Sequence, residues 1–354
     1  MTMRFAARPD QPPPRVAAKT AMNHAAQARE PFVVIKHPPA RHEALRGAVV
    51  AIGNFDGVHR GHRAVIATAL QRAKTLRRPA AALTFEPHPR RVFWPGEPLF
   101  RLTPERAKLR LLAGAGLDGA IVLPFDAELA ALSAQEFISR ILVQRFAVSG
   151  VAIGFDFHFG LNRAGSPDYL AAQGAKLGFA VDIVPRFEDA GRVVRSGLIR
   201  AALSAGRVAQ ANELLGYPWF VSAEVVRGDQ RGRELGYPTA NLQLDPDCAL
   251  AHGIYAVRVG LGGRRYDGVA SFGRRPMFDQ GTVLLEAFLF DFSGDLYGQT
   301  IDVAFIDWIR PERKFDTVQH LIDRMGEDAH TARAALARLP DAFPRLGELP
   351  AQGS

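Results

Sequence analysis

The sequence predicts an α/β domain built on a parallel sheet, followed by a small antiparallel β-barrel with a terminal helix. Two observations support this prediction. Strand and helix patterns alternate from about residue 46 to residue 205, which favours a parallel sheet covered by helices on both faces. From residue 220 onward, short strand patterns are separated by glycine-rich turns, which is typical of a small barrel.

The alternation in the first half begins with the apolar run Ala48–Ile52, whose length fits a buried strand. A helix is expected to begin at Thr103, because Pro104 and Glu105 follow it and both are favoured in a first helical turn. The other expected elements are, in order, helix Arg63–Leu76, strand Ala80–Phe85, strand Ala120–Leu123, helix Ala134–Arg145, strand Gly150–Ile153, helix Ser166–Leu177, strand Ala180–Val184 and helix Arg207–Leu215.

The second half is expected to contain strands and one long helix. The helix, Val318–Leu339, should stop before Pro340, which cannot continue it. The expected strands are Val221–Val226, Ile254–Val259, Tyr266–Ala270, Val283–Phe290 and Ile301–Ile306. We therefore predict a disordered tail at 1–30, a first domain at 31–205, a linker at 206–218, a second domain at 219–340 and a disordered tail at 341–354.

Charge and cysteine content restrict the class of protein. Of the net charge of +8, residues 1–48 contribute +5, so the rest of the chain is only mildly basic and shows no long basic stripe for nucleic acid. Cys248 is the single cysteine, which suits a reducing compartment. No apolar run reaches the roughly 18 residues needed to span a bilayer. We expect a cytoplasmic enzyme without nucleic-acid or membrane partners.

Residues 53–62, GNFDGVHRGH, lie where the first strand ends and the first helix begins. Ligands of parallel α/β sheets bind at this edge, and a helix N-terminus there favours phosphate. The three glycines would let the backbone approach a nucleotide closely. His59 and His62 can donate hydrogen bonds to a phosphate as charge builds during transfer. The segment therefore predicts a nucleotidyl-transfer site.

Two other phosphate-binding patterns do not apply. Residues 114–119, GAGLDG, fit GxGxxG but follow a helix and precede a strand, which is the reverse of the dinucleotide fingerprint. We interpret them as a helix-ending turn. The sequence contains no GxxxxGK[ST] loop, so any kinase activity is not of the P-loop kind.

The segment at 53–62 resembles the signature of prokaryotic riboflavin kinase/FMN adenylyltransferases, members of the HxGH nucleotidylyltransferase superfamily. Thr84–Pro89 and Gly154–Gly160 follow in the order of that family. The resemblance implies attack of the FMN phosphate on the α-phosphorus of ATP. Asp156 either contacts the flavin or caps a turn. The resemblance implies ATP or phosphate contacts by Gly53, Asn54, Phe55, Asp56, Gly57 and Gly61, with His59 and His62 catalytic.

One motif departs from the family pattern. The family usually has a hydroxyl-rich Ser-Ser-Thr/Ser-x-Ile/Val-Arg stretch before a helix, and RSGLIR stands at 195–200 here. Ser196 and Arg200 match and are expected to bind ATP phosphates, whereas Arg195 and Gly197 replace hydroxyl residues. The departure raises the alternative of a riboflavin kinase whose adenylyltransferase module is weakened or regulatory.

A second motif lies between Gly228 and Asn241 and contains the tetrapeptide Pro-Thr-Ala-Asn. The Thr239 hydroxyl and the Asn241 carbonyl are hard oxygen ligands, which suit Mg²⁺ shared with ATP phosphates. The tetrapeptide resembles the riboflavin kinase signature. Gly228 and Gly232 are then expected at the ATP phosphates.

Glu286 lies within the apolar strand pattern Val283–Phe290, where a carboxylate needs a partner or a function. The resemblance assigns the matching glutamate as the general base for the 5′-hydroxyl of riboflavin. Arg310 and Phe315 fall in the region expected to bind flavin. The alternative for Glu286 is a structural ion pair.

The resemblance as a whole implies phosphorylation of riboflavin to FMN and then adenylylation of FMN to FAD. The implied substrates are riboflavin, FMN and ATP, with Mg²⁺, in a monomer or weak homo-oligomer. Two further readings remain open: a nucleotidylyltransferase for another substrate, and a non-enzymatic flavin- or nucleic-acid-binding protein.

Overall fold

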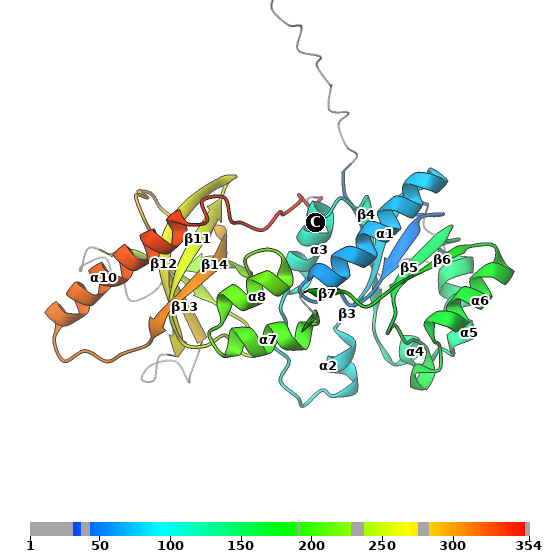
Figure 1. Ribbon diagram of the computed structural model, residues 1–354, viewed down its shortest axis with the longest axis horizontal. Coiled ribbons are helices and arrows are strands. Elements are labelled where there is room, and N and C mark those ends of the chain that lie inside the picture. The colour runs from blue at the N-terminus through cyan, green and yellow to red at the C-terminus, as the bar shows by residue number, and fades with distance from the viewer. Residues whose placement is uncertain (1–30, 37–42, 190–191, 228–236, 275–282, 351–354) are drawn as a thin grey trace, which may run out of the picture. The chain divides into compact units, whose positions relative to one another are not determined.

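The computed structural model describes residues 31–36, 43–189, 192–227, 237–274 and 283–350. Its first half contains a six-stranded sheet in the order β1-β4-β3-β2-β5-β6. Figure 1 shows strands of this sheet with helices beside them. All neighbouring strands in this sheet are parallel. The strands are β1 (Val33–Lys36), β2 (Val49–Ile52), β3 (Ala80–Glu86), β4 (Gly119–Pro124), β5 (Gly150–Gly154) and β6 (Ala180–Val184).

Each face of the sheet packs in its own apolar cluster. The odd-numbered residues of β2 pack with α1 (Arg60–Leu76) and α3 (Glu105–Gly114). The even-numbered residues pack with the π-helix η1 (Phe137–Arg145) and α6 (Pro167–Leu177). Because successive side chains of a strand point to opposite faces, a sheet with apolar residues at every position needs cover on both sides. The prediction of a parallel sheet covered on both faces is confirmed.

Several short elements of the first half were not predicted, because a few residues carry too little periodicity. These include the edge strand β1 and the helix α2. The helix expected at Ala134–Arg145 is present, but most of it is the π-helix η1. The remaining elements are α2 (Pro89–Phe93), α4 (Ala127–Ala131), α5 (Ala134–Glu136), the 3-10 turn η2 (Leu161–Arg163), the hairpin β7 (Glu188–Asp189) with β8 (Arg192–Val193), α7 (Ser196–Ser204) and α8 (Val208–Leu215).

The second half is a closed antiparallel barrel in the order β10-β13-β12-β11-β14-β9, followed by α10 (Val318–Ala337). The barrel confirms the predicted fold class. One strand of the barrel, β10, is not among the expected strands, because its five residues include the polar Thr239 and Asn241. The strands are β9 (Phe220–Val226), β10 (Thr239–Gln243), β11 (Gly253–Leu261), β12 (Arg264–Arg274), β13 (Val283–Leu289) and β14 (Thr300–Pro311).

The C-terminal segment differs from the prediction of disorder over 341–354. Phe343, Leu346 and Leu349 pack against the larger apolar cluster. The backbone N–H of Gly347 donates a hydrogen bond to the carbonyl oxygen of Arg110 in α3 at 2.9 Å. Three apolar side chains spaced along a short segment supply the burial that orders it. The predicted tail at 1–30 lies outside the described residues.

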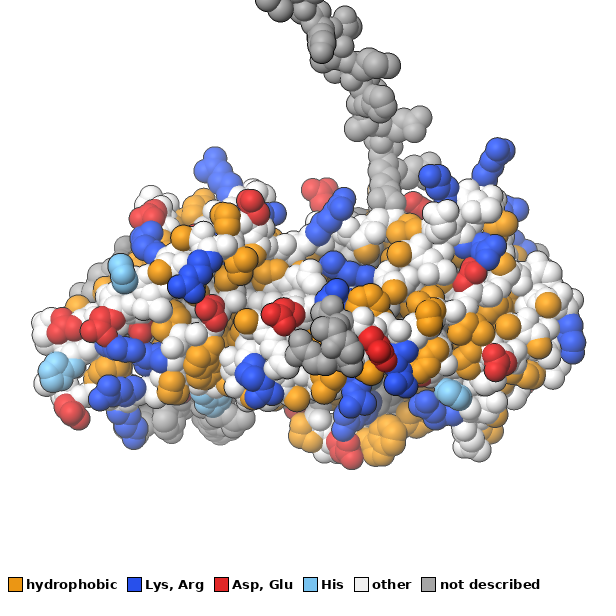
Figure 2. Space-filling view, viewed as in Figure 1, with side chains coloured by type: hydrophobic (Ala, Val, Ile, Leu, Met, Phe, Trp, Pro, Cys, Tyr) orange, Lys and Arg blue, Asp and Glu red, His pale blue; other side chains and the backbone are white. Residues whose placement is uncertain are grey.

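Among the residues that the structure describes, no helix is long and apolar enough to cross a membrane. On the face shown in Figure 2, Lys and Arg side chains are interspersed with acidic and apolar ones rather than gathered in a stripe. That distribution agrees with the mild basic excess expected beyond residue 48.

Candidate active sites

The loop that begins at Gly53 connects β2 to α1 at the carboxyl edge of the parallel sheet. Three of its residues have left-handed backbone angles: Phe55 at φ 49°, Gly57 at 87° and Val58 at 36°. A positive φ is unusual for Phe and exceptional for a β-branched residue, so neighbouring contacts must hold the loop. Phe55 and Val58 are almost completely buried. Their burial in the apolar core anchors the loop from below.

The two histidines of the loop stack on each other, with ring centroids 3.6 Å apart and 14° between the planes. His59 is the N-cap of α1, and its Nδ1 accepts a hydrogen bond from the backbone N–H of His62 at 3.2 Å. A neutral His59 ring that accepts at Nδ1 carries its proton on Nε2. Nδ1 of His62 is buried and has no hydrogen-bond partner among the described residues. Both rings line the cleft above the loop, and His59 has a proton on Nε2 that it can donate.

Both histidines are neutral at pH 7. Burial lowers the pKa of His59 from 6.5 to about 4, although the carboxylate of Asp56 opposes the shift. Burial also holds the pKa of His62 well below 6.5, and the neighbouring His59 and Lys108 lower it further. Neutral rings can donate hydrogen bonds to a phosphate without like-charge repulsion between them.

Asp56 and Arg200, both predicted to contact phosphates, form an ion pair with each other. The Arg200 guanidinium donates to the Asp56 carboxylate at 2.5 Å and to the carbonyl oxygen of Phe100 at 2.6 Å. The same carboxylate accepts from the backbone N–H of Thr103 at 3.0 Å. The Ser196 hydroxyl donates to the carbonyl oxygen of Asp56 at 2.9 Å. Ser196 and Arg200, the two residues of α7 that match the family motif, both bind Asp56. These bonds hold α7 against the loop.

A buried lysine that sequence reasoning missed lies beneath the same loop. Lys108 of α3 pairs with the Glu86 carboxylate at 2.8 Å, and its ammonium group contacts the Thr84 hydroxyl at 3.1 Å and the carbonyl oxygen of Asn54 at 3.4 Å. Arg101 also binds Glu86, at 2.6 and 2.8 Å. Burial lowers the pKa of Lys108, and the Glu86 carboxylate opposes that shift. This network joins the ends of β2 and β3. A Lys inside an otherwise apolar helix face was the available sequence signal.

A cleft of about 1140 Å³ opens over the loop. Asp156 lies in its wall, exposed, and the ring of His88 lines it as the N-cap of α2. Burial lowers the pKa of His88 to about 4. Of the predicted site residues, the cleft is lined by Gly53, Asn54, Phe55, His59, Gly61, His62, Asp156 and Ser196, whereas Asp56, Gly57 and Arg200 are outside its lining. It is also lined by aromatic residues that sequence reasoning did not single out, Phe93, Trp94, Phe125, Phe157 and Phe159.

The residues predicted for the kinase site are brought together by strand register. Asn241 of β10 is paired with Glu286 of β13, and Glu286 is paired with Ser271 of β12. Thr239 is two residues before Asn241, so its side chain lies on the same face of β10. Glu286 is half-buried beside these polar neighbours, rather than enclosed by apolar side chains as its sequence context suggested. Gly228 and Gly232 lie outside the described residues.

Asn241 supports a metal site at this position. Its side chain is 5 % exposed, its Nδ2 donates to the carbonyl oxygen of Thr239 at 3.3 Å, and its Oδ1 has no hydrogen-bond partner within the described ranges. A buried carbonyl oxygen without a donor is costly unless a ligand or ion completes it. The oxygen donors of Thr239 and Asn241 are of the kind that Mg²⁺ prefers.

Comparisons with known proteins assign both halves. Residues 41–198 match the FAD synthetase family, and residues 215–336 match the riboflavin kinase family. The chain is 40% identical over 293 residues to the bifunctional riboflavin kinase/FMN adenylyltransferase of Pseudomonas fluorescens, covering 82% of this chain and 94% of the relative. This chain belongs to that bifunctional family.

The enzyme resembles other members to a similar extent. The relative of the same name from Escherichia coli is 40% identical, with 81% of this chain and 92% of the relative covered. A crystal structure described as a macrolide-efflux protein from Streptococcus pneumoniae shares the fold, with a TM-score of 0.76, 33% identity and coverage of 84% and 99%. Because both catalytic domains are present, the enzyme makes FMN from riboflavin and FAD from FMN. The bifunctional prediction is confirmed over the alternative of a riboflavin kinase with a weakened or regulatory adenylyltransferase module.

The predicted flavin-binding residues of the kinase half are engaged with their neighbours. The guanidinium of Arg310 binds the Asp328 carboxylate at 2.6 to 3.1 Å and lies 5.8 Å from the ring centre of Phe315. Glu312, which sequence reasoning gave no role, lies over Gly273, where any side chain would collide with its carboxylate. Burial and the nearby Glu286 raise the pKa of Glu312. A second carboxylate therefore lies close to the predicted general base.

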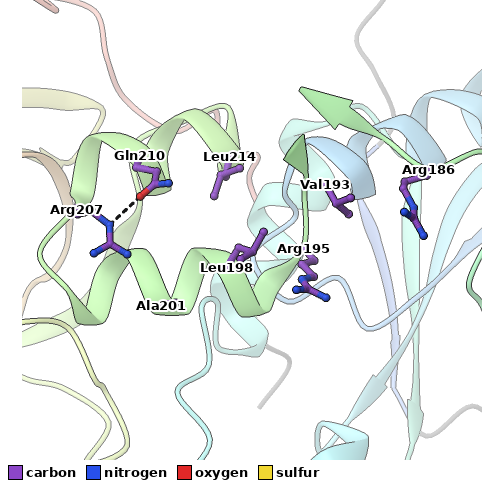
Figure 3. Close-up of a pocket in the computed structure, with 8 residues that line it drawn as sticks. All are labelled: Arg186, Val193, Arg195, Leu198, Ala201, Arg207, Gln210 and Leu214. Atoms are coloured by element: carbon purple, nitrogen blue, oxygen red, sulfur yellow. Dashed lines mark hydrogen bonds between the residues drawn. The ribbon is translucent and has the colours of Figure 1, made fainter. Parts of the chain in front are cut away.

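A smaller cavity of about 450 Å³ lies beside α7 and α8 (Figure 3). Arg195 at the start of α7 and Arg207 before α8 line it, and Arg207 donates to the Gln210 side chain at 2.9 Å. Arg195 and Arg186 also line the larger cleft, so the two cavities adjoin. Arg195, one of the two residues that depart from the family motif, thus lies at the border of the nucleotidyl-transfer cleft.

Proposed function

We propose that the loop at 53–62 carries out the adenylyl transfer with His59 and His62 as its catalytic residues. An oxygen of the FMN phosphate attacks the α-phosphorus of ATP, the bond to the β-phosphate oxygen breaks, and pyrophosphate leaves. The histidines donate hydrogen bonds to the α-phosphate as its charge grows, which is the role of preorganised donors. The stacked rings of His59 and His62, which both line the cleft, are the observation that supports this assignment.

Phosphate binding in this cleft is divided among the predicted residues. Gly53, Asn54, Phe55 and Gly61 line the cleft and are proposed to contact ATP. Asp56, Gly57 and Arg200 lie behind it and are proposed to hold the loop, because their bonds go to protein groups. Asp156 is exposed in the wall and is proposed to face the flavin substrate.

We further propose that Glu286 is the general base of riboflavin phosphorylation. Its carboxylate takes the proton of the 5′-hydroxyl as that oxygen attacks the γ-phosphorus of ATP, and ADP leaves. Thr239 and Asn241 would hold Mg²⁺, which neutralises charge on the ATP phosphates. The register pairing of Asn241 with Glu286 supports placing the base next to the phosphates. Gly228, Gly232 and Phe315 remain proposed ligand contacts.

The remaining proposals concern the protein as a whole. We propose that residues 206–218 link the domain that adenylylates FMN to the domain that phosphorylates riboflavin. We also propose that the enzyme is a monomer or weak homo-oligomer. We propose a cytoplasmic location, supported by the single cysteine, Cys248.

Chromatography of the products formed from riboflavin, ATP and Mg²⁺ tests both activities in one experiment. We expect FMN to appear first and FAD to follow. Chelation of the metal should abolish FMN formation from riboflavin, because Asn241 and Thr239 supply neutral oxygens that cannot replace its charge. If the enzyme forms FMN but no FAD, even when FMN and ATP are supplied, the adenylylation proposal is contradicted.

A further inference from the structure

The segment between the two halves carries a buried tyrosine that contacts the nucleotidyl-transfer loop. Tyr217 follows α8, where Gly216 at φ 78° turns the chain. The side chain of Tyr217 is 6 % exposed, and its hydroxyl donates a hydrogen bond to the carbonyl oxygen of Gly57 at 2.6 Å. Tyr217 lies within the riboflavin kinase match, beyond the end of the FAD synthetase match at residue 198.

Neighbouring contacts attach this tyrosine to the barrel. Two residues further on, the carbonyl oxygen of Trp219 accepts a hydrogen bond from the backbone N–H of Phe305 in β14 at 2.8 Å. The backbone N–H of Trp219 donates to the side chain of Asn212 in α8 at 2.7 Å. The indole N–H of Trp219 donates to the carbonyl oxygen of Leu102 in the first half at 2.9 Å. The chain directly after Tyr217 is therefore held by contacts with both halves of the protein.

The loop needs hydrogen bonds such as that from Tyr217 to hold its backbone at Gly57. Gly57 is buried at φ 87°, and Val58 after it has φ 36°. The N–H of Gly57 donates to the Thr103 hydroxyl at 2.8 Å, and its carbonyl oxygen accepts from Tyr217. Without the tyrosine hydroxyl, a buried carbonyl oxygen would lose this donor, and the loop would shift to recover one. His59 is two residues away.

We propose that Tyr217 is a positioning residue for adenylyl transfer, supplied by the segment that links the two halves of the chain. Its hydroxyl fixes the Gly57 peptide and thereby the places of His59 and His62. The inference rests on the assignment of adenylyl transfer to this loop. It also revises the proposed division of the chain, because adenylylation then requires a residue beyond 205. A misplacement of about 1 Å at a reacting group can cost roughly 10²-fold in rate.

Tyr217→Phe in the full chain tests the proposal, because it removes the hydroxyl and keeps the ring. With FMN and ATP supplied, we expect kcat for FAD formation to fall about 10- to 100-fold, with the KM values for FMN and ATP nearly unchanged. Phosphorylation of riboflavin by the same preparation should stay at the parental rate. That second activity also reports the fraction of folded protein.

Tyr255→Phe is the matched control. Tyr255 is also buried, and its hydroxyl also donates to a backbone carbonyl oxygen, that of Ala251, but within the barrel. FAD formation by this variant should equal that of the parent. An unchanged kcat in Tyr217→Phe would overturn the proposal, as would an equal loss of both activities or an equal loss in the control. If the parent itself made no FAD, the adenylylation assignment would fail instead.

Discussion

The adenylylation loop and the kinase strands place their reactive side chains by different kinds of contact. His59 caps α1 and His62 lies in its first turn, directly after a loop with three left-handed residues. Side chains from α3, α7 and the segment after α8 hold that loop. Glu286 and Asn241 lie opposite each other on paired strands, where backbone register alone sets their separation. Tertiary contacts hold the strained backbone that positions the histidines of the first site. Strand pairing positions the side chains of the second site.

This difference predicts different sensitivities to substitution. A strained loop keeps its geometry only while distant partners remain, so changes at residues outside the cleft should reach the first site. Antiparallel register is fixed by many backbone hydrogen bonds and by the inward apolar face of the barrel, so single side chains contribute little to it. The kinase site should therefore respond mainly to changes at its own residues.

The largest loss of activity is expected when both histidines of the first site are replaced. His59→Ala combined with His62→Ala removes both proposed donors to the α-phosphate, and each such loss typically costs about 10²–10³ in rate. FAD formation from supplied FMN should become undetectable, whereas FMN formation from riboflavin should persist. Both rates can be followed by chromatography. FAD formation at the parental rate would contradict the site assignment.

Glu286→Gln breaks the second site with a smaller expected effect. The amide keeps the shape and hydrogen bonding of the side chain but cannot accept the proton of the riboflavin hydroxyl. Phosphorylation should fall by about 10²–10⁴, the usual contribution of a positioned base. Adenylylation of supplied FMN measured on the same sample should be unchanged. Normal kinase turnover in this variant would make Glu286 a structural carboxylate.

The buried histidines also predict a pH dependence of stability for the first half. The pKa of His59 is lowered to about 4 in the folded chain, so between pH 6.5 and 4 the unfolded chain binds the extra proton. Stability is complete above pH 6.5 and is lost as the pH falls through this window, by about 3 kcal/mol for His59 at most.

Denaturant unfolding of His59→Asn at several pH values measures this contribution. The slope of unfolding free energy against pH between 6.5 and 4 should be smaller than in the parent, because the titrating group is gone. His330→Asn, at an exposed position on α10, is the control and should keep the parental slope. Identical slopes in parent and His59→Asn would argue against a buried neutral ring.

The smallest effect is expected at residues 195–200, the motif that differs from the family pattern. Arg195→Ser with Gly197→Thr restores the hydroxyls of the family pattern at the start of α7. If those hydroxyls bind ATP phosphates, the KM for ATP should fall a few-fold and FAD formation should speed up. Arg207→Ala, which alters only the smaller cavity, should leave both unchanged. A loss of activity in the double variant would mean that Arg195 already contacts phosphate.

The sequence by itself determined much of this protein. Apolar runs such as Ala48–Ile52 predicted a sheet buried on both faces, because only such a strand has no polar side. The motif at 53–62 predicted a nucleotidyl-transfer site from its residue types and its place after a strand. The resemblance of this motif and of the stretch at 228–241 to a known family implied the two activities. Residues adjacent in the sequence keep their spacing in the fold, so local motifs remain readable.

Tertiary structure alone decided which of the predicted residues line the cleft and which are bonded to other protein groups. Asp56 and Arg200 carry the charges expected at a phosphate, yet they neutralise each other behind the loop. Lys108 and Tyr217 contact the loop from 54 and 160 residues away. No local pattern specifies such partners, because they are chosen by where separate elements pack. The sequence fixes the reactive groups, and long-range packing determines how firmly each is held.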